Sequence, residues 1–281
     1  MLRPAQWTKN LLVLAPLVFA RRVAQPESVW LALQAATAFC LVSSALYIVN
    51  DLLDRDADRR HPVKRRRSIA SGTVHRDTAL VAAVVLGALG FLVVLPLPAP
   101  AFLCLLGFAA LGLAYSLQLK RVVIVDVLAL AGGYVLRAAA GAFALQVEMS
   151  SWLLICTMLL ALFLALAKRR QELELTSRPR ATRVVLGSYS PALLDQMIAV
   201  VSSSTLMSYI LYAFAEQTTR KFPSGLMPLT VPFVLFGLFR YLFLIHRRGE
   251  GGDPERLLFR DTPLLVNLVL WAAAVLAVAA G

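Results

Sequence analysis

The chain has little charge for its length. Only 16% of its 281 residues are charged, whereas 59% are hydrophobic. Soluble domains carry about a quarter charged residues, so this chain is too poor in charge to cover an ordinary water-facing surface. Apolar runs of about twenty residues, each long enough to cross a bilayer as a helix, recur along almost the whole length. The sequence therefore excludes a soluble domain of useful size and predicts an all-α, polytopic membrane protein.

Cysteine and histidine are also scarce. The three cysteines, Cys40, Cys104 and Cys156, lie inside apolar runs without metal-ligand spacing, which favours small hydrophobic residues in helices over a disulfide or a zinc site. The three histidines are scattered, and the sequence has no Gly-x-Ser-x-Gly motif and no Walker loop. A mechanism based on histidine is therefore disfavoured.

The basic residues predict how the helices cross the membrane. The net charge is +12, and most of the 28 Lys and Arg residues fall in alternate connecting segments. By the positive-inside rule we expect the N-terminus to be cytoplasmic. In a soluble protein an excess of positive charge would suggest binding to nucleic acid, but here the membrane topology explains it. We expect no nucleic-acid partner and a single membrane domain over residues 1–281. The expected helices are about nine, at roughly 7–21, 28–52, 77–96, 100–117, 124–145, 151–168, 192–214, 226–246 and 262–280.

Three aspartates continue the second apolar run. The spacing i, i+3, i+7 places Asp51, Asp54 and Asp58 on one face of a helix, and Asn50 borders that face. Oxygen ligands without His or Cys suit Mg²⁺, which would also relieve the repulsion between the carboxylates. A solvated acidic helix end is the alternative, but it does not account for Asn50 and Asp51 inside an apolar flank. We therefore expect a Mg²⁺ site formed by Asn50, Asp51, Asp54 and Asp58.

Further polar clusters contain the remaining candidate site residues. Basic side chains beside a metal site typically hold a phosphorylated ligand, although those directly after the acids also suit a topological anchor or anionic lipid headgroups. Arg137 lies deep in the fifth segment, where a structural ion pair and substrate binding are both open. For Arg240 in the eighth segment, the structural pair is favoured. The candidate substrate-binding residues are Lys9, Asn50, Lys64, Arg65, Arg67, Tyr115, Lys120, Asp126, Arg137, Lys168, Arg169, Glu172 and Tyr189.

These motifs resemble the UbiA superfamily of intramembrane prenyltransferases. The pattern N-D-x-x-D-x-x-x-D at 50–58, on the second of the nine segments, carries that resemblance. Ordinary members have a second D-x-x-x-D motif where this chain has Lys168, Arg169 and Glu172. A basic replacement there suits a donor with an additional phosphate. The motifs that resemble the phosphoribosyl-transferring branch are R-P-x-Q-W-T-K-N at 3–10, R-x-H-P-x-K-R-x-R at 59–67, Y-S-x-x-L-K at 115–120, L-R-A-x-A-G at 136–141, K-R-x-x-E-L at 168–173, G-D-P-E at 252–255 and F-R-D at 259–261.

The resemblance implies a Mg²⁺-dependent phosphoribosyltransferase at the cytoplasmic face of a bacterial inner membrane. It would move a 5-phosphoribosyl group from phosphoribosyl diphosphate (PRPP) to a polyprenyl phosphate such as decaprenyl phosphate, for cell-wall or surface arabinan synthesis. Asp51, Asp54 and Asp58 would act in catalysis through the metal. One alternative is an ordinary UbiA-type prenyl transfer to an aromatic acceptor. A weaker one is a non-catalytic lipid-binding or transport protein. The oligomeric state, a homo-oligomer included, is open.

Overall fold

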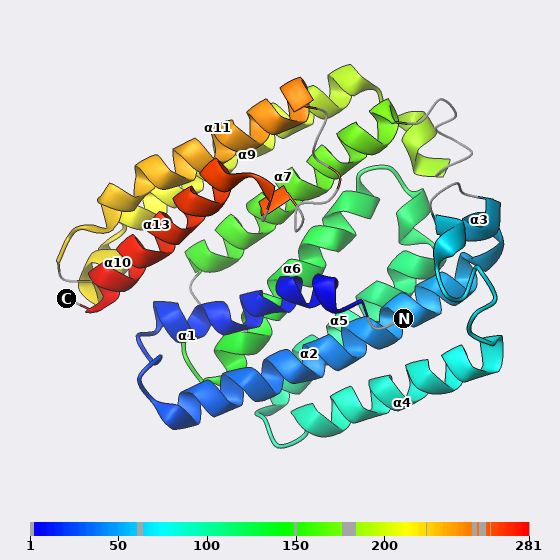
Figure 1. Cartoon of the computed structure of the whole chain (residues 1–281). Coiled ribbons are helices and arrows are strands. Elements are labelled where there is room, and N and C mark those ends of the chain that lie inside the picture. Colours follow the sequence, from blue (N-terminus) through cyan, green and yellow to red (C-terminus); the bar gives the residue numbers. More distant parts are fainter. Residues whose placement is uncertain are drawn as a thin grey trace. The chain divides into compact units, whose positions relative to one another are not determined.

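The protein is represented by a computed structural model whose described regular structure is entirely helical (Figure 1). The chain divides into two compact units, Met1–Met149 and Ser150–Gly281. The single domain expected over residues 1–281 stays a prediction. The structure describes residues 3–60, 64–148, 151–175, 184–222, 224–248, 252, 257–258 and 260–280.

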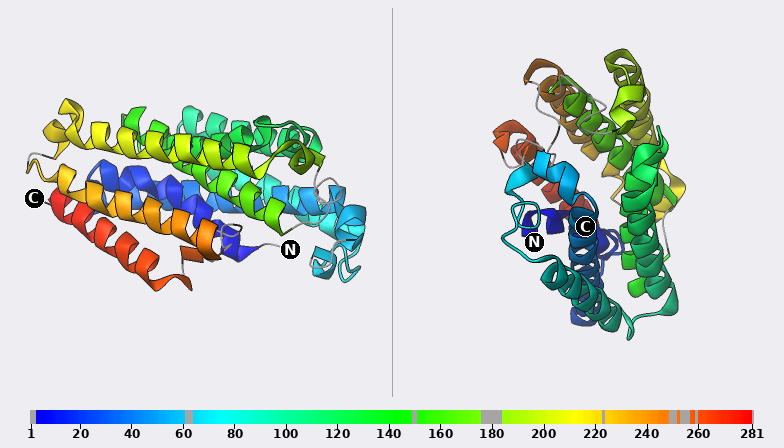
Figure 2. Two further views of the ribbon diagram at one scale, coloured as in Figure 1. Left: turned by 90° about the horizontal axis from the view of Figure 1, so that it is seen from above. Right: turned by 90° about the vertical axis from the view of Figure 1, so that its right-hand side faces the viewer.

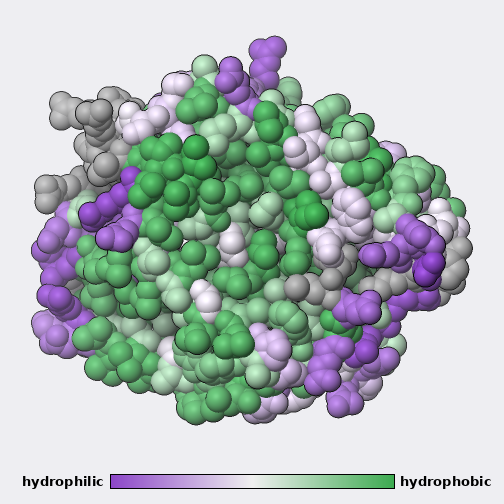
Figure 3. Space-filling model, turned by 180° about the vertical axis from the view of Figure 1, so that it is seen from behind, coloured by the Kyte–Doolittle hydropathy of each residue, from purple (hydrophilic) through white to green (hydrophobic). Residues whose placement is uncertain are grey.

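Seven helices are long and apolar enough to cross a membrane. Together with the absence of strands from the described residues, they confirm the all-α, multi-pass architecture. Figure 3 shows apolar side chains over most of the face seen, with hydrophilic ones gathered toward its margins. The seven spans are Pro26–Leu53 (α2), Arg76–Val94 (α4), Ala99–Leu117 (α5), Val125–Ala144 (α6), Ser151–Glu174 (α7), Pro191–Phe214 (α9) and Met227–Arg248, which includes α11 (Val231–Arg248).

The first and last expected spans differ from the other seven. The segment expected at 7–21 is mostly a 3-10 helix, η1 (Pro4–Leu14), followed by the short α1 (Ala15–Phe19). Pro16 lies at the start of α1, where its missing N–H and fixed φ favour a new helix over the continuation of an old one. In α13 (Thr262–Ala280), the described apolar stretch Thr262–Val278 is shorter than the seven spans. Nine spanning helices and the cytoplasmic N-terminus therefore stay predictions.

In the first unit, glycines allow helices to pack closely. α2 lies beside α4 (Figure 1), and a Cβ at Gly90 would come within 2.6 Å of Val42 Cγ2. A Cβ at Gly141 in α6 would collide with the carbonyl oxygen of Val13 in η1. Small residues of this kind are what allow membrane helices to approach. η1 is thus packed tightly on α6, and its N-terminal side reaches the end of α2 through Arg3 and the interior of α6 through Asn10.

Short elements at one end of this unit complete it. They connect the long helices and contain many of the polar residues singled out from the sequence. These elements are α3 (Arg55–Arg60), η2 (Lys64–Arg66) and η3 (Leu119–Arg121).

In the second unit, α9 lies beside both α7 and α11 (Figure 2). Phe163 of α7 packs on Tyr241 of α11, with ring centroids 5.3 Å apart. The Tyr209 hydroxyl accepts a hydrogen bond from Trp271 Nε1 of α13 at 2.9 Å. The first contact joins α7 to α11, and the second joins α9 to α13 (Thr262–Ala280). The short elements of this unit are η4 (Val184–Ser188), α10 (Glu216–Lys221) and η5 (Met227–Thr230).

Candidate functional site

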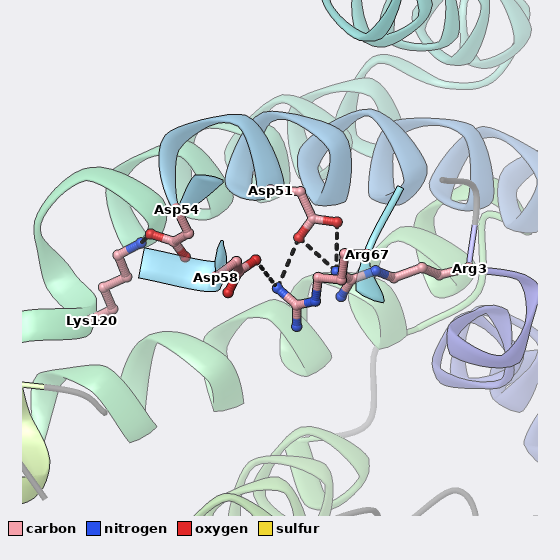
Figure 4. Close-up of polar contacts among 6 residues, drawn as sticks. All are labelled: Arg3, Asp51, Asp54, Asp58, Arg67 and Lys120. Carbon is pink, nitrogen blue, oxygen red and sulfur yellow. Dashed lines mark hydrogen bonds and ion pairs between the residues drawn. The ribbon is translucent and has the colours of Figure 1, made fainter. Parts of the chain in front are cut away.

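Two carboxylates converge on one arginine at the end of α2 (Figure 4). Arg67 Nη1 donates to Asp51 Oδ1 at 3.0 Å and to Asp58 Oδ2 at 2.7 Å. Both carboxylates are buried, since Asp51 is 7% exposed and Asp58 is 4% exposed. The convergence agrees with the spacing in the sequence, which placed the two residues two helical turns apart on one face. Two buried carboxylates thus share a single cationic atom.

Asp54, the third aspartate, turns toward a different cation. α2 ends at Leu53, and Asp54 adopts φ −92° and ψ 5° before α3 begins at Arg55. Its Oδ1 accepts a hydrogen bond from Lys120 Nζ at 2.7 Å (Figure 4). Among the described residues, no three acidic, His or Cys side chains gather closely enough to hold a metal ion. The structure therefore brings together two of the three expected ligands, and Asn50 lies half-buried beside them.

The loop after α3 is fixed so that Arg67 faces the acids. Arg59 Nε donates to the carbonyl oxygen of Ala70 at 3.1 Å, which ties α3 to the far end of the loop. Ile69 is buried in a small apolar cluster with Ile48 of α2 and anchors the same segment. The burial of Ile69 and the hydrogen bond from Arg59 to the Ala70 carbonyl thus hold this loop against α2. Arg65, expected in the phosphate clamp, is exposed at this end, whereas the Lys64 side chain and residues 61–63 lie outside the described residues.

Arg3 belongs to the same cluster, although it was not among the predicted site residues. Its Nη2 lies 2.6 Å from both carboxylate oxygens of Asp51, and its guanidinium carbon lies 5.3 Å from the centroid of the Tyr47 ring. Arg3 is part of the R-P-x-Q-W-T-K-N motif, and that motif was the available signal. The pairing itself spans 48 residues, a separation across which helical spacing carries no information.

A second buried arginine lies in the same unit. Arg137 of α6 is 5% exposed, and its Nε donates to Asn10 Oδ1 at 2.7 Å. Its Nη1 donates to the Gly133 carbonyl at 2.9 Å, and its guanidinium carbon lies 4.3 Å from the centroid of the Phe108 ring. Asn10 is 1% exposed and also donates to Cys40 Sγ at 3.2 Å. Asn10, which sequence reasoning missed as a site residue, thus orients this guanidinium.

The other candidates in the first unit lie near the same connections. Asp126 is fully buried at the start of α6. Lys9 in η1 and Tyr115 in α5 are half-buried, and Lys9 directly precedes Asn10. Asp126, Lys9 and Tyr115 all have polar or electrostatic partners in the structure. These three therefore stay predicted substrate-binding residues.

The second unit contains the remaining predicted residues. Arg169 of α7 is 1% exposed, and its Nη1 donates to Glu172 Oε2 at 2.7 Å. Lys168 is half-buried one residue earlier, and Tyr189 is buried after η4. Arg169 and Glu172, three residues apart on α7, thus pair across one turn of the helix. The sequence did not predict a pair between the neighbouring residue Arg170 and α9, in which Arg170 Nε donates to Asp195 Oδ1 at 2.8 Å.

Arg240 forms the structural pair that the sequence favoured. Its Nε and Nη2 donate to Asp261 Oδ1 and Oδ2 at 3.0 and 2.7 Å. Asp261 Oδ1 also accepts a hydrogen bond from the backbone N–H of Leu264 at 3.0 Å, in the first turn of α13. The arginine lowers the pKa of this carboxyl, and the Leu264 N–H contributes in the same direction. Asp261 thus joins α11 to the start of α13.

A family model and the sequences of curated proteins both identify relatives of this chain. Residues 11–262 match the model of the UbiA prenyltransferase family. The decaprenyl-phosphate phosphoribosyltransferase of Corynebacterium glutamicum is 35% identical over 96% of this chain and 82% of its own length. The enzyme of the same name from Mycobacterium tuberculosis is 33% identical over 98% of this chain and 91% of its own length.

Solved structures agree on the fold. The structure of a UbiA homologue from Archaeoglobus fulgidus bound to DMAPP and Mg²⁺ matches with a TM-score of 0.75 and 20% identity, over 100% of this chain and 98% of that one. An apo UbiA homologue from Aeropyrum pernix matches with a TM-score of 0.69 and 15% identity, over 99% and 98% of the two chains. With a family match over most of the chain and relatives above 30% identity along nearly all of it, this membrane protein belongs to the UbiA prenyltransferase family.

Proposed function

We propose that the protein transfers a 5-phosphoribosyl group from PRPP to a polyprenyl phosphate such as decaprenyl phosphate, and releases diphosphate. The observation that carries the proposal is the similarity to decaprenyl-phosphate phosphoribosyltransferases along nearly the whole chain. The local chemistry supports it, because Arg3, Arg67 and Lys120 surround the acidic stripe, and cations of this kind suit a multiply phosphorylated donor. The product would be polyprenyl-phosphoryl-5-phosphoribose, a precursor suited to cell-wall or surface arabinan.

The reaction needs charge stabilisation more than proton transfer. An oxygen of the lipid phosphate attacks C1 of the ribose, and the bond from C1 to the diphosphate oxygen breaks. The sugar passes through an oxocarbenium-like state, as in other glycosyl transfers. The lipid phosphate is already anionic at neutral pH, so it requires no general base. The groups needed are therefore those that hold phosphates and neutralise the leaving diphosphate.

A divalent metal fits the acidic stripe. The fit rests on Arg67 Nη1, which lies within 3.0 Å of oxygens from both Asp51 and Asp58, so that two carboxylates already converge on one positive group. Asp51 and Asp58, with Asn50 next to Asp51 in the chain, would hold Mg²⁺, and hard oxygen ligands suit that ion. Asp54, whose Oδ1 accepts from Lys120 in this structure, would join them only after it leaves that lysine. When bound, Mg²⁺ supplies neutralisation of the charge that develops on the diphosphate.

The basic and amide groups would hold the phosphates. Lys120 lies at the open edge of the cluster on Asp54, whose side chain is 33% exposed, and could turn toward a phosphate of the donor. Arg137 retains its charge in a buried position and, oriented by Asn10, would hold another phosphate. We place this site at the cytoplasmic face of the inner membrane, because PRPP is a soluble metabolite and Arg3, Arg67 and Lys120 all lie at the same end of the first unit.

A donor competition assay tests the proposal. Purified protein would be incubated with Mg²⁺, polyprenyl phosphate and labelled PRPP, and in parallel with a labelled prenyl diphosphate and an aromatic acceptor. We expect label in the lipid only from PRPP, and loss of labelling when Mg²⁺ is chelated. Label transferred from the prenyl diphosphate alone would overturn the proposal in favour of ordinary prenyl transfer.

Asp51→Asn separates catalysis from a structural role in the same assay. We expect it to lower turnover by about 100-fold or more, because it removes one charged group from the diphosphate site. Asp77→Asn is the matched control, since Asp77 is an exposed aspartate at the start of α4 in the same unit. Equal activity of the two variants would show that Asp51 has no role in the reaction.

A further inference from the structure

Arg3 is paired with Asp51, a carboxylate that the proposed mechanism uses to bind the metal. Its Nη2 lies 2.6 Å from both Asp51 oxygens, and Asp51 Oδ1 also accepts the bond from Arg67. Both oxygens of Asp51 are thus engaged by cations of the chain itself. A metal ion that binds Asp51 must displace at least one of these arginines.

The backbone position of Arg3 makes it the more replaceable of the two. Arg3 precedes η1 as its N-cap residue, in a left-handed conformation with φ 48°. The two side chains are equally exposed, at 28%, so the difference lies in what else each of them holds. Arg3 contacts α2 through Asp51 and through the face of the Tyr47 ring. Arg67, by contrast, bridges Asp51 and Asp58 from a loop anchored by Ile69. Arg3 can therefore leave Asp51 without any change in α2 or in the loop.

The charges of the cluster balance. Asp51, Asp54 and Asp58 provide three negative charges, and they are bound by Arg3, Arg67 and Lys120, which provide three positive charges. A bare divalent cation would give this half-buried cluster an excess of two positive charges and would leave a displaced guanidinium facing the metal, which is unfavourable at short range. A cation that arrives with a diphosphate brings the anion that the displaced guanidinium needs.

We propose that Arg3 is a specificity-determining residue that makes the acidic stripe select a metal–diphosphate complex over the bare metal. Arg3 neutralises Asp51 while the donor is absent. When the complex binds, the guanidinium exchanges the Asp51 oxygens for oxygens of the diphosphate, and Asp51 becomes a metal ligand. Metal and diphosphate therefore bind with positive coupling, and Arg3 contributes to that coupling. The inference rests on the proposed function, because it assigns the metal–diphosphate complex to the same carboxylates.

Titration of Mn²⁺ by electron paramagnetic resonance tests the coupling without turnover. Free Mn²⁺ is measured with the purified protein in detergent, with and without inorganic diphosphate. For the wild type we expect weak binding of Mn²⁺ alone and much tighter binding with diphosphate. For Arg3→Gln we expect about three- to tenfold tighter binding of Mn²⁺ alone, because one charge-assisted pair no longer competes. The enhancement by diphosphate should shrink by at least the same factor.

A matched variant controls for net charge. Arg76→Gln removes one positive charge from an exposed position at the start of α4 in the same unit. We expect it to leave both Mn²⁺ affinities unchanged. An equal effect of Arg76→Gln and Arg3→Gln would overturn the inference, because the effect would then belong to net charge.

The remaining outcomes are equally decisive. Weaker Mn²⁺ binding by Arg3→Gln would show that Arg3 holds Asp51 in position, and unchanged affinity would show that it does not compete, so either result overturns the inference. If Arg3→Gln fails to fold, Arg3→Lys is the second variant, because it keeps the positive charge but has fewer hydrogen-bond donors. It should tighten the binding of Mn²⁺ alone by a measurable factor of less than about threefold. Failure of these tests in a protein that still labels polyprenyl phosphate from PRPP would sink the inference alone. A wild type that labels nothing would sink the proposed function.

Discussion

Arg137 and Arg240 both lie within apolar helices of this protein, and they differ in what surrounds their charge. Arg240 in α11 directs both sides of its guanidinium fork to the Asp261 carboxylate. Arg137 in α6 contacts the Asn10 amide oxygen, the Gly133 carbonyl and the Phe108 ring. In the part of the chain that the structure describes, none of the groups that contact Arg137 is a carboxylate.

The difference separates a structural arginine from a candidate ligand-binding one. Asp261 has both oxygens on Arg240 and also accepts the Leu264 N–H, so this pair is saturated by the chain itself. Arg137 is oriented by neutral acceptors and by π faces, which hold a guanidinium without cancelling its charge. A buried, uncancelled positive charge in a membrane protein is a functional site by default. We therefore propose that the Arg137 charge serves an anionic substrate, whereas that of Arg240 is used by Asp261.

Among variants of the two arginines and their partners, the largest expected effect comes from Arg137→Met. A thioether side chain of similar length removes the buried charge and strands no carboxylate, so the thermal unfolding temperature should be unchanged or higher. Transferase activity should fall by about 10- to 150-fold in kcat/KM, the range expected when a hydrogen bond to a charged group is lost. Steady-state kinetics and thermal unfolding in detergent measure both effects.

Arg240→Met is the matched control for that variant. It strands the Asp261 carboxylate, so the unfolding temperature should fall while the activity of the folded fraction is retained. If Arg137→Met lost stability and Arg240→Met lost activity instead, the roles assigned to the two arginines would be reversed.

Asn10→Asp would make Arg137 resemble Arg240. The substitution places a carboxylate where the amide oxygen now lies, 2.7 Å from Arg137 Nε. The guanidinium would then be neutralised internally, and we expect KM for an anionic substrate to rise about tenfold with little loss of stability. Asn10→Leu, which leaves the arginine charged but unoriented, should lower kcat more than it raises KM. An unchanged KM in Asn10→Asp would contradict a substrate-binding role for Arg137.

Asp261→Ala tests the structural side of the comparison. It removes the acceptor for Leu264 N–H at the start of α13, a loss of about 0.5–2 kcal/mol for a helix cap, and it also removes the partner of Arg240. Thermal unfolding should therefore shift to lower temperature. Asp261→Asn retains capping ability and should be milder. Equal stability of Asp261→Ala and the wild type would show that the pair does not hold α13.

The smallest expected effect is a dependence of stability on pH. Because Arg240 lowers the pKa of Asp261, the carboxylate stabilises the folded state at pH values above the ordinary aspartate pKa of about 3.9. This stabilisation is lost as the pH falls through the lowered pKa of the folded state. The unfolding temperature of the wild type should therefore decline more steeply between about pH 5 and about pH 3 than that of Asp261→Asn. Identical slopes would mean that this carboxyl contributes nothing.

The sequence was sufficient for the architecture and for part of the site. Long apolar runs predicted the seven spans, and the i, i+7 spacing predicted that Asp51 and Asp58 share a face. The spacing could not show that the helix is interrupted at Asp54, because a spacing rule assumes a continuous helix through Asp58. Asp54 therefore turns to Lys120 and away from the other two acids.

Pairs between residues far apart in the chain could not be predicted from the sequence, for a physical reason. Arg3 with Asp51 and Arg240 with Asp261 join residues 48 and 21 positions apart, and such pairs depend on how helices pack. Hydropathy likewise identified the apolar segment after Lys9 but could not distinguish a 3-10 helix from a spanning α-helix. Pro16 was the local signal for that interruption.

Mass spectrometry of the lipid after incubation with PRPP and Mg²⁺ tests the central claim most directly. Decaprenyl phosphate should gain the mass of one phosphoribosyl group with the wild-type protein, and Asp51→Asn and Arg137→Met should form far less of this product. A lipid whose mass does not change while the same preparation consumes a prenyl diphosphate would contradict the proposed phosphoribosyl transfer.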